Sequence, residues 1–200
     1  MEQENEATWV DPTPGSFLLV FAITFGGWAV FTEQVNMFEA LPVFGYYFLA
    51  FGIYWLIAAI IDFRIGDMIG GAINGVFGVL LGLGPGLAFI LDAHFMAREV
   101  ALDTTLEGYF LLFTGIIFFV FAIAAGSRSW LLTVMLGILG VAFLILGYPI
   151  SGLTTEMMWF DIGGWLLLIA GIIALYASCS FIFNEAYDRT VLPLGGPVIK

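Results

Sequence analysis

Six long apolar runs constrain this chain more than any other feature of its sequence. They cover residues 16–31, 43–61, 68–91, 108–125, 131–148 and 162–183. A helix that crosses a bilayer needs about 20 predominantly apolar residues, and each run is of that order. Hydrophobic residues make up 62% of the 200 residues and charged residues only 10%, whereas a soluble domain carries about 25% charge. The sequence therefore predicts an all-α integral membrane protein, one bundle of six transmembrane helices.

The basic residues predict how this bundle is oriented. With the N-terminus in the cytoplasm, the residues on the cytoplasmic side are Arg64, Arg128, Arg189 and Lys200. Only Arg98 then lies outside. The positive-inside rule therefore predicts two cytoplasmic termini. They are the segments 1–15 and 184–200, which flank a transmembrane domain of residues 16–183.

The three arginines at the cytoplasmic helix ends also recur at a regular spacing. Arg64, Arg128 and Arg189 follow the second, fourth and sixth helices. This favours three consecutive helix hairpins. Topology alone explains the pattern equally, because the positive-inside rule places arginine at every second helix end.

Charge and motif content exclude several functional classes. The net charge of −11 argues against a nucleic-acid partner, since phosphate binding needs clustered lysine and arginine. Asp62, Asp92, Asp161 and Glu185 lie at the ends of the runs, where we expect them to reach the membrane interface. No nucleophile with an adjacent base lies in a run, so we predict a protein that is not an enzyme and that uses no cofactor or metal.

Glycines follow one face of the third run. They are three or four residues apart: Gly71, Gly75, Gly78, Gly82 and Gly86. Such a face lets another helix approach closely, either within the protomer or across a subunit boundary. Asn74 and Phe77 lie on the adjoining strip. An asparagine within the bilayer needs a partner, so Asn74 either stabilises packing or donates a hydrogen bond in a pore.

The first helix begins with the sequence Asp-Pro-Thr-Pro-Gly at residues 11–15. Asp11 suits the N-cap, and Pro12 suits the first helical position. The same helix N-terminus could instead face an anion at a pore mouth, although the negative charge of Asp11 opposes this. A pore without buried charge would hold its solute through hydroxyl, amide and backbone donors, with apolar constrictions controlling wetting.

The sixth run ends in a polar segment. Glu185 and Arg189 are one helical turn apart, in the order that favours an ion pair. Pro193 stops any continuation of the helix. These features predict a cytoplasmic anchor instead of a substrate site.

Both ends of the chain resemble the acetate uptake transporters, the succinate–acetate permease family. Residues 11–15 resemble the Asn-Pro-x-Pro-x-Gly opening of that family. Residues 184–195 resemble its Asn-Glu-x-x-x-Arg-Thr-Val-Leu-Pro close more strongly. The turn at 62–66 and the positions Gly164, Trp165, Gly171, Ala174 and Tyr176 also match. The residues that carry these motifs are read as structural: Pro12, Pro14, Asp62, Asn184, Glu185, Arg189 and Pro193.

The resemblance implies a homohexamer in the plasma membrane, with one pore in each protomer. The family moves acetate, and in some members succinate, as a channel or as a proton-coupled carrier. Its pore narrows at a Phe, a Tyr and a Leu. These positions fall on Val20, with Phe21 adjacent, on Phe77, and on Gly137, with Leu136 adjacent. Phe in place of Tyr removes a hydroxyl donor, and Val and Gly would widen the neck unless neighbouring Phe side chains fill it. These changes place the identity of the solute in question.

These observations together predict a channel or transporter for acetate or a related small monocarboxylate. The solute would pass between a mouth at Asp11 and an outer vestibule, past Phe77 and Asn74. Two alternatives stay open. One is a channel for a small neutral solute such as urea, ammonia or carbon dioxide, and the other is a non-conducting structural subunit of the membrane.

Overall fold

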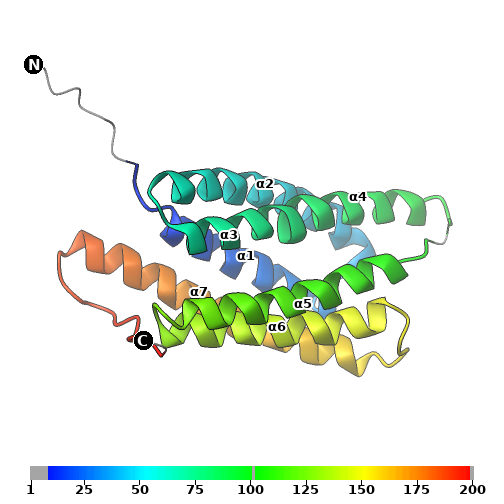
Figure 1. Cartoon of the computed structure of the whole chain (residues 1–200). Helices are drawn as coiled ribbons and strands as arrows, with labels where there is room; N and C mark the ends of the chain where they lie inside the picture. The colour runs from blue at the N-terminus through cyan, green and yellow to red at the C-terminus, as the bar shows by residue number, and fades with distance from the viewer. Residues whose placement is uncertain (1–8, 101, 199–200) are drawn as a thin grey trace, which may run out of the picture.

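The computed structural model describes residues 9–100 and 102–198. The secondary-structure elements in this part of the chain are all helices, and none is a strand (Figure 1). The elements are α1 (Thr13–Phe31), α2 (Met37–Arg64), α3 (Met68–Val76), η1 (Phe77–Leu83), α4 (Gly84–Met96), α5 (Thr105–Ala125), α6 (Trp130–Ile150) and α7 (Met158–Ala186). α3, η1 and α4 are continuous, and together they form the third of the spans, Met68–Met96. The described residues thus contain six helices long and apolar enough to cross a membrane. The predicted all-helical architecture is confirmed.

Most helices extend beyond the apolar runs into the polar residues that flank them. α2 begins at Met37, and its Pro42 lies in the second turn, where it removes one internal hydrogen bond. Polar side chains satisfy the free backbone groups at some of these ends. The Asp67 carboxylate accepts a hydrogen bond of 2.8 Å from the Gly70 N–H at the start of α3. The Ser129 hydroxyl accepts one of 3.2 Å from the Leu131 N–H at the start of α6.

The third span has a wide π-helical turn in its middle, the segment η1. Pro85 follows it in the first turn of α4. Proline has no N–H to donate, so the carbonyl groups one turn before it must find other donors. The Gly84 N–H reaches back to the Val79 carbonyl, five residues earlier. The π-helical turn thus accommodates the proline within a continuous span.

The glycine face of the third span packs against α2 of the same protomer. A Cβ on Gly78 would lie 2.7 Å from the Leu56 side chain, and one on Gly86 would lie 2.9 Å from the Gly45 carbonyl. At Gly82 the added atom would meet the backbone of Gly52. The small residues therefore bring two helix backbones together, and the packing is within the protomer.

The helices pair differently from three consecutive hairpins. The main pairs are α2 with the third span, α5 with α6, and α1 with α7, while α6 also packs against α7. α1 has few contacts with α2. Gly171 of α7 lies against Thr24 of α1 and permits this close approach. The hairpin prediction is therefore wrong, and topology explains the spacing of the arginines.

The bundle has two ends, which we name by the predicted orientation. The inner end, at the left of Figure 1, holds residues 9–12, 65–67, 126–129 and 187–198. The outer end holds the connection at residues 32–36, the described residues 97–100 and 102–104, and the connection between α6 and α7.

Candidate functional site

A cavity of about 60 Å³ opens between α1, the third span and the ends of α5 and α6 nearest the inner end. Most of its wall is apolar and includes Phe17, Val20, Ile73, Phe77, Leu132 and Leu136. Its polar wall consists of Thr13, Ser16, Asn74, Arg128 and the backbone of Gly70. The cavity exceeds the roughly 10–15 Å³ that a cavity needs to hold one water molecule, so it has room for a small solute.

An aromatic cluster fills the bundle where this cavity ends. We define it as Trp55, Phe77, Phe118 and Phe143. The Phe77 ring is 2% exposed and lies 5.5 Å from the Trp55 ring and 5.2 Å from the Phe118 ring, between centroids. Phe143 packs on the far side of Phe118, at 5.2 Å. The Trp55 indole N–H donates to the Ser16 carbonyl at 3.4 Å, which ties the cluster to α1.

Four of the residues predicted for the solute pathway lie together on the cavity wall. They are Val20, Asn74, Phe77 and Leu136. They come from α1, from the third span and from α6, so residues far apart in the sequence meet at one place. Val20, Phe77 and Leu136 are apolar, and apolar side chains at a narrow point of a pore control whether water enters it.

Two other predicted pathway residues lie elsewhere. The Phe21 ring packs 5.9 Å from that of Phe25, a side chain exposed on the surface of the bundle. A Cβ on Gly137 would meet nothing within 4 Å, and Gly137 lies between the exposed Val134 and Val141 on α6. Successive helix residues differ by about 100° in direction, and at these two positions the neighbouring residue, Val20 or Leu136, is the one on the cavity wall.

Asp62 is completely buried, with 0% of its surface exposed, where the sequence predicted a residue that reaches the interface. Its Oδ2 accepts a hydrogen bond of 2.7 Å from the Asn74 amide. Its Oδ1 has no hydrogen-bond partner in the part of the chain that the structure describes. The prediction was wrong because α2 continues to Arg64 and α3 folds back over the carboxyl group. Asn74 therefore serves both packing and the cavity wall.

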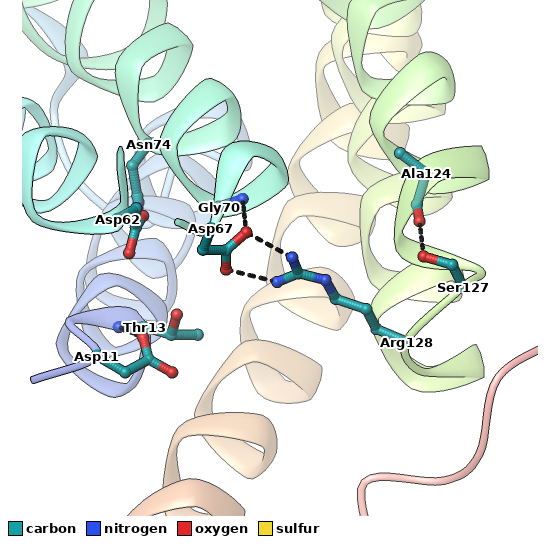
Figure 2. A network of polar contacts seen from close by, with 9 residues as sticks. All are labelled: Asp11, Thr13, Asp62, Asp67, Gly70, Asn74, Ala124, Ser127 and Arg128. Atoms are coloured by element: carbon teal, nitrogen blue, oxygen red, sulfur yellow. Dashed lines mark hydrogen bonds and ion pairs between the residues drawn. The ribbon is translucent and has the colours of Figure 1, made fainter. Parts of the chain in front are cut away.

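Arg128 and Asp67 form a two-pronged ion pair at the inner end of the cavity (Figure 2). The two terminal nitrogens of Arg128 lie 2.6 and 2.5 Å from the two oxygens of Asp67. This is the only ion pair within residues 9–100 and 102–198. The hydrogen bonds from Arg128 lower the pKa of Asp67, and the same bonds raise the pKa of Arg128. Sequence analysis used Arg128 only to predict the orientation of the bundle, since the partner of Arg128 is 61 residues away.

Asp11 lies exposed at the inner end, near Asp62 in Figure 2, and is not part of the cavity wall. Its Oδ1 accepts a hydrogen bond of 2.8 Å from the Thr13 N–H. The helix begins at Thr13, with Pro14 in its first turn and Pro12 immediately before it. The N-cap position is therefore Pro12 and not Asp11 as predicted, although Asp11 still accepts the first N–H of the helix.

Residues 187–198 fold back onto the inner end of the bundle, and we call this segment the C-terminal clasp. The side chain of Asn184 makes three of the hydrogen bonds that hold it. The Asn184 side-chain oxygen Oδ1 accepts hydrogen bonds from the N–H groups of Val191 and Leu192, at 2.6 and 3.0 Å, and its side-chain Nδ2 donates to the Leu192 carbonyl at 2.9 Å. The Tyr176 hydroxyl donates to the Pro193 carbonyl at 3.0 Å.

This clasp continues along the connection between α5 and α6. Three contacts hold it there: Ser129 donates to the Leu194 carbonyl, the Trp130 N–H donates to the Gly196 carbonyl at 3.0 Å, and the Val198 N–H donates to the Gly126 carbonyl at 2.8 Å.

The predicted ion pair between Glu185 and Arg189 is not formed, which corrects the sequence analysis. The helix ends at Ala186, and Asp188 has a positive φ of 48°, so Arg189 no longer follows the helical spacing. Pro193 lies well beyond this point and does not end the helix.

A second hollow of about 340 Å³ opens near the outer end, between α4 and the start of α5. Its acidic wall residues are Asp92, Asp103 and Glu107. Asp92 is buried, contrary to the expectation that it reaches the interface. The hollow therefore combines apolar walls from α4 with carboxyl groups on the predicted outer side.

Comparison with solved structures identifies the fold. The structure of the bacterial acetate channel SatP superposes on this chain with a TM-score of 0.75, at 18% sequence identity. The match covers 94% of this chain and 100% of that one. No protein-family model and no curated protein matches the sequence. The likeness confirms the fold that the resemblance to the acetate uptake transporters implies.

Proposed function

We propose that this protein is a membrane channel or transporter for acetate or a related small monocarboxylate. One observation carries the proposal: the chain has the fold of an acetate channel over nearly its whole length, and a cavity lies where the resemblance to the acetate uptake transporters puts the constriction. Val20, Phe77 and Leu136 supply the apolar wall of this neck. The solute would enter the cavity at the inner end and pass the aromatic cluster when its rings move apart.

The chemistry of the cavity fits a small solute with one polar end. Its apolar wall suits a methyl or other short hydrocarbon group, and the Asn74 amide and the Arg128 guanidinium offer donors for carboxylate oxygens. The contacts are few, which fits fast passage better than tight binding. Succinate, with two charged ends, matches this wall less well than a monocarboxylate.

Flux through the purified protein tests the proposal. Proteoliposomes should take up labelled acetate faster than empty liposomes, at both acidic and neutral pH and with and without a pH gradient. A dependence on the gradient would identify a proton-coupled carrier. Uptake no faster than in empty liposomes under every condition would refute the proposal.

A channel for a small neutral solute is the second candidate, and the charge balance at the inner end favours it. Arg128 is already paired with Asp67, and the carboxyl groups of Asp62 and Asp11 lie nearby (Figure 2). An anion would therefore meet a net negative mouth. Urea or ammonia flux that acetate fails to inhibit would favour this candidate over the first.

We further propose, from the resemblance to the acetate uptake transporters, a homohexamer in the plasma membrane with both termini in the cytoplasm. The extensive apolar surface of the single chain supports embedding in lipid and contact with neighbouring copies. Native mass spectrometry from detergent would measure the assembly, and a protease added to sealed cells would test the side on which residues 187–198 lie.

A further inference from the structure

We propose that the inner end of the cavity binds a solute carboxylate at Arg128, and that the solute takes the place of the Asp67 carboxylate there. This inference rests on the proposed function and deepens it. It assigns Arg128 as the recognition residue and Asp67 as an internal competitor. The ligand class is a small, planar carboxylate, and the binding step is an exchange of one carboxylate for another.

The geometry at Arg128 is the first ground. Both terminal nitrogens of its guanidinium contact the two oxygens of a single carboxylate, at 2.6 and 2.5 Å. This paired contact is the arrangement in which arginine binds carboxylates most specifically. Arg128 also lines the cavity, so a solute inside it can reach the same nitrogens. Among the described residues, Arg128 is the only basic side chain on that wall.

The exposure of the pair is the second ground. The side chains of Arg128 and Asp67 are 43% and 18% exposed. The Arg128 side chain is thus partly open to solvent, and water competes for the partners of an ion pair in such a position. A solute carboxylate can therefore reach the guanidinium and compete with Asp67 for it. Asp62 could not exchange in this way because it is completely buried against Asn74.

The two partners also differ in the other contacts that hold them. Arg128 lies in the connection that the C-terminal clasp binds through Gly126, Ser129 and Trp130. Asp67 is the N-cap of α3, and its carboxylate also accepts the Gly70 N–H at 2.8 Å. The Asp67 carboxylate therefore keeps a second hydrogen-bond partner when a solute takes its place at Arg128, and Arg128 is the recognition site.

The exchange also explains how an anion crosses an acidic mouth. While Asp67 holds Arg128, the one basic side chain on the cavity wall is neutralised, and the carboxyl groups of Asp11 and Asp62 lie nearby (Figure 2). A carboxylate offers a separate oxygen to each nitrogen of the guanidinium, whereas a spherical anion such as chloride offers both nitrogens one acceptor atom. The internal carboxylate thereby selects for solutes of its own chemical class.

Acetate binding to four purified variants tests the exchange, measured by isothermal titration calorimetry in parallel with proteoliposome flux. Asp67→Asn removes the competitor and should tighten acetate binding by about 2- to 5-fold, the scale of an exposed ion pair. Arg128→Gln should weaken it by about tenfold or more, because a charge-assisted two-pronged contact is lost. Arg128→Lys keeps the charge without the fork and should reduce the preference for acetate over chloride.

Arg64→Gln is the matched control. Arg64 lies at the same end and stacks 5.8 Å from the Trp9 ring, but it is not on the cavity wall. This variant removes the same charge and should leave acetate binding unchanged. An equal weakening in Arg64→Gln and Arg128→Gln would mean that net charge alone acts, which would overturn the exchange.

The direction in which each variant changes the acetate affinity distinguishes the exchange from a purely structural role of the ion pair. If the ion pair only holds the two connections together, Asp67→Asn and Arg128→Gln should both weaken binding, and that result overturns the proposal. No acetate binding by the wild-type protein overturns it as well. Opposite shifts in binding without any flux would support the exchange while the proposed transport function fails. Flux without opposite shifts would leave the transport function standing and the exchange refuted.

Discussion

Replacing Phe77 by alanine tests whether the aromatic cluster closes the pathway. The ring is 2% exposed and contacts the rings of Trp55 and Phe118, at 5.5 and 5.2 Å. Lipid is as apolar as the core of a membrane bundle, so transfer from water contributes little here and packing dominates. An aromatic pair contributes about 0.5–1.5 kcal/mol beyond burial, so the two contacts together are worth about 1–3 kcal/mol.

This free energy stabilises the closed arrangement of the rings, and Phe77→Ala removes it. The equilibrium between closed and open pathways should therefore shift by about 5- to 150-fold toward open. We expect acetate uptake into proteoliposomes to rise within this range. The free energy of unfolding, measured by denaturant titration in mixed micelles, should fall by about 1–3 kcal/mol.

Two controls accompany this variant. Phe77→Tyr keeps the ring and introduces the side chain found in the acetate uptake transporters, so closure should persist. Phe113→Ala removes a ring that is 55% exposed on the outside of α5, and its flux should equal that of the wild type. If Phe77→Ala loses stability as expected and its flux stays within about twofold of the wild type, the cluster is not the barrier and the reasoning is refuted.

Asn74→Ala should destabilise the protein by about 1–3 kcal/mol, because it removes the only described hydrogen-bond partner of the buried Asp62 carboxyl group. The double variant with Asp62→Asn should recover part of that loss in the same denaturant titration. Gly82→Ala should disrupt the packing of the third span on α2 and lower the thermal unfolding temperature, whereas Gly137→Ala should not, because its added atom meets open space. The lowered pKa of Asp67 means that its ion pair stabilises the protein above the unfolded pKa and is lost as the pH falls. Between about pH 5 and 2 the wild type should therefore lose more stability than Asp67→Asn, and equal losses would contradict this.

The helices could be predicted from the sequence because length and apolarity alone determine whether a segment can cross a bilayer. Their pairing could not be predicted, because it depends on which small residues face one another, as Gly171 and Thr24 do. The regular spacing of the arginines suggested hairpins, but it reports only the side of the membrane on which each arginine lies.

The candidate site was predictable where a motif fixed the position and unpredictable where a distant partner decided it. The resemblance to the acetate uptake transporters led to Phe77 and Val20, which line the cavity. It could not choose between Leu136 and Gly137, since that choice depends on the rotation of α6. The burial of Asp62 and the pairing of Arg128 both depend on contacts between separate elements, which no local pattern encodes.

The pairing of α1 with α7 sets an order on biogenesis. The Ser178 hydroxyl of α7 donates to the Pro14 carbonyl of α1 across 164 positions of sequence, at 2.7 Å. The first of the six spans therefore gains its main packing partner only when the sixth has been inserted, and until then its described contacts are mainly those with α2. Val20, on the same helix, is part of the cavity wall, to which α7 contributes no residue. The position of that part of the wall thus depends on the last helix to be inserted, although the solute never touches it.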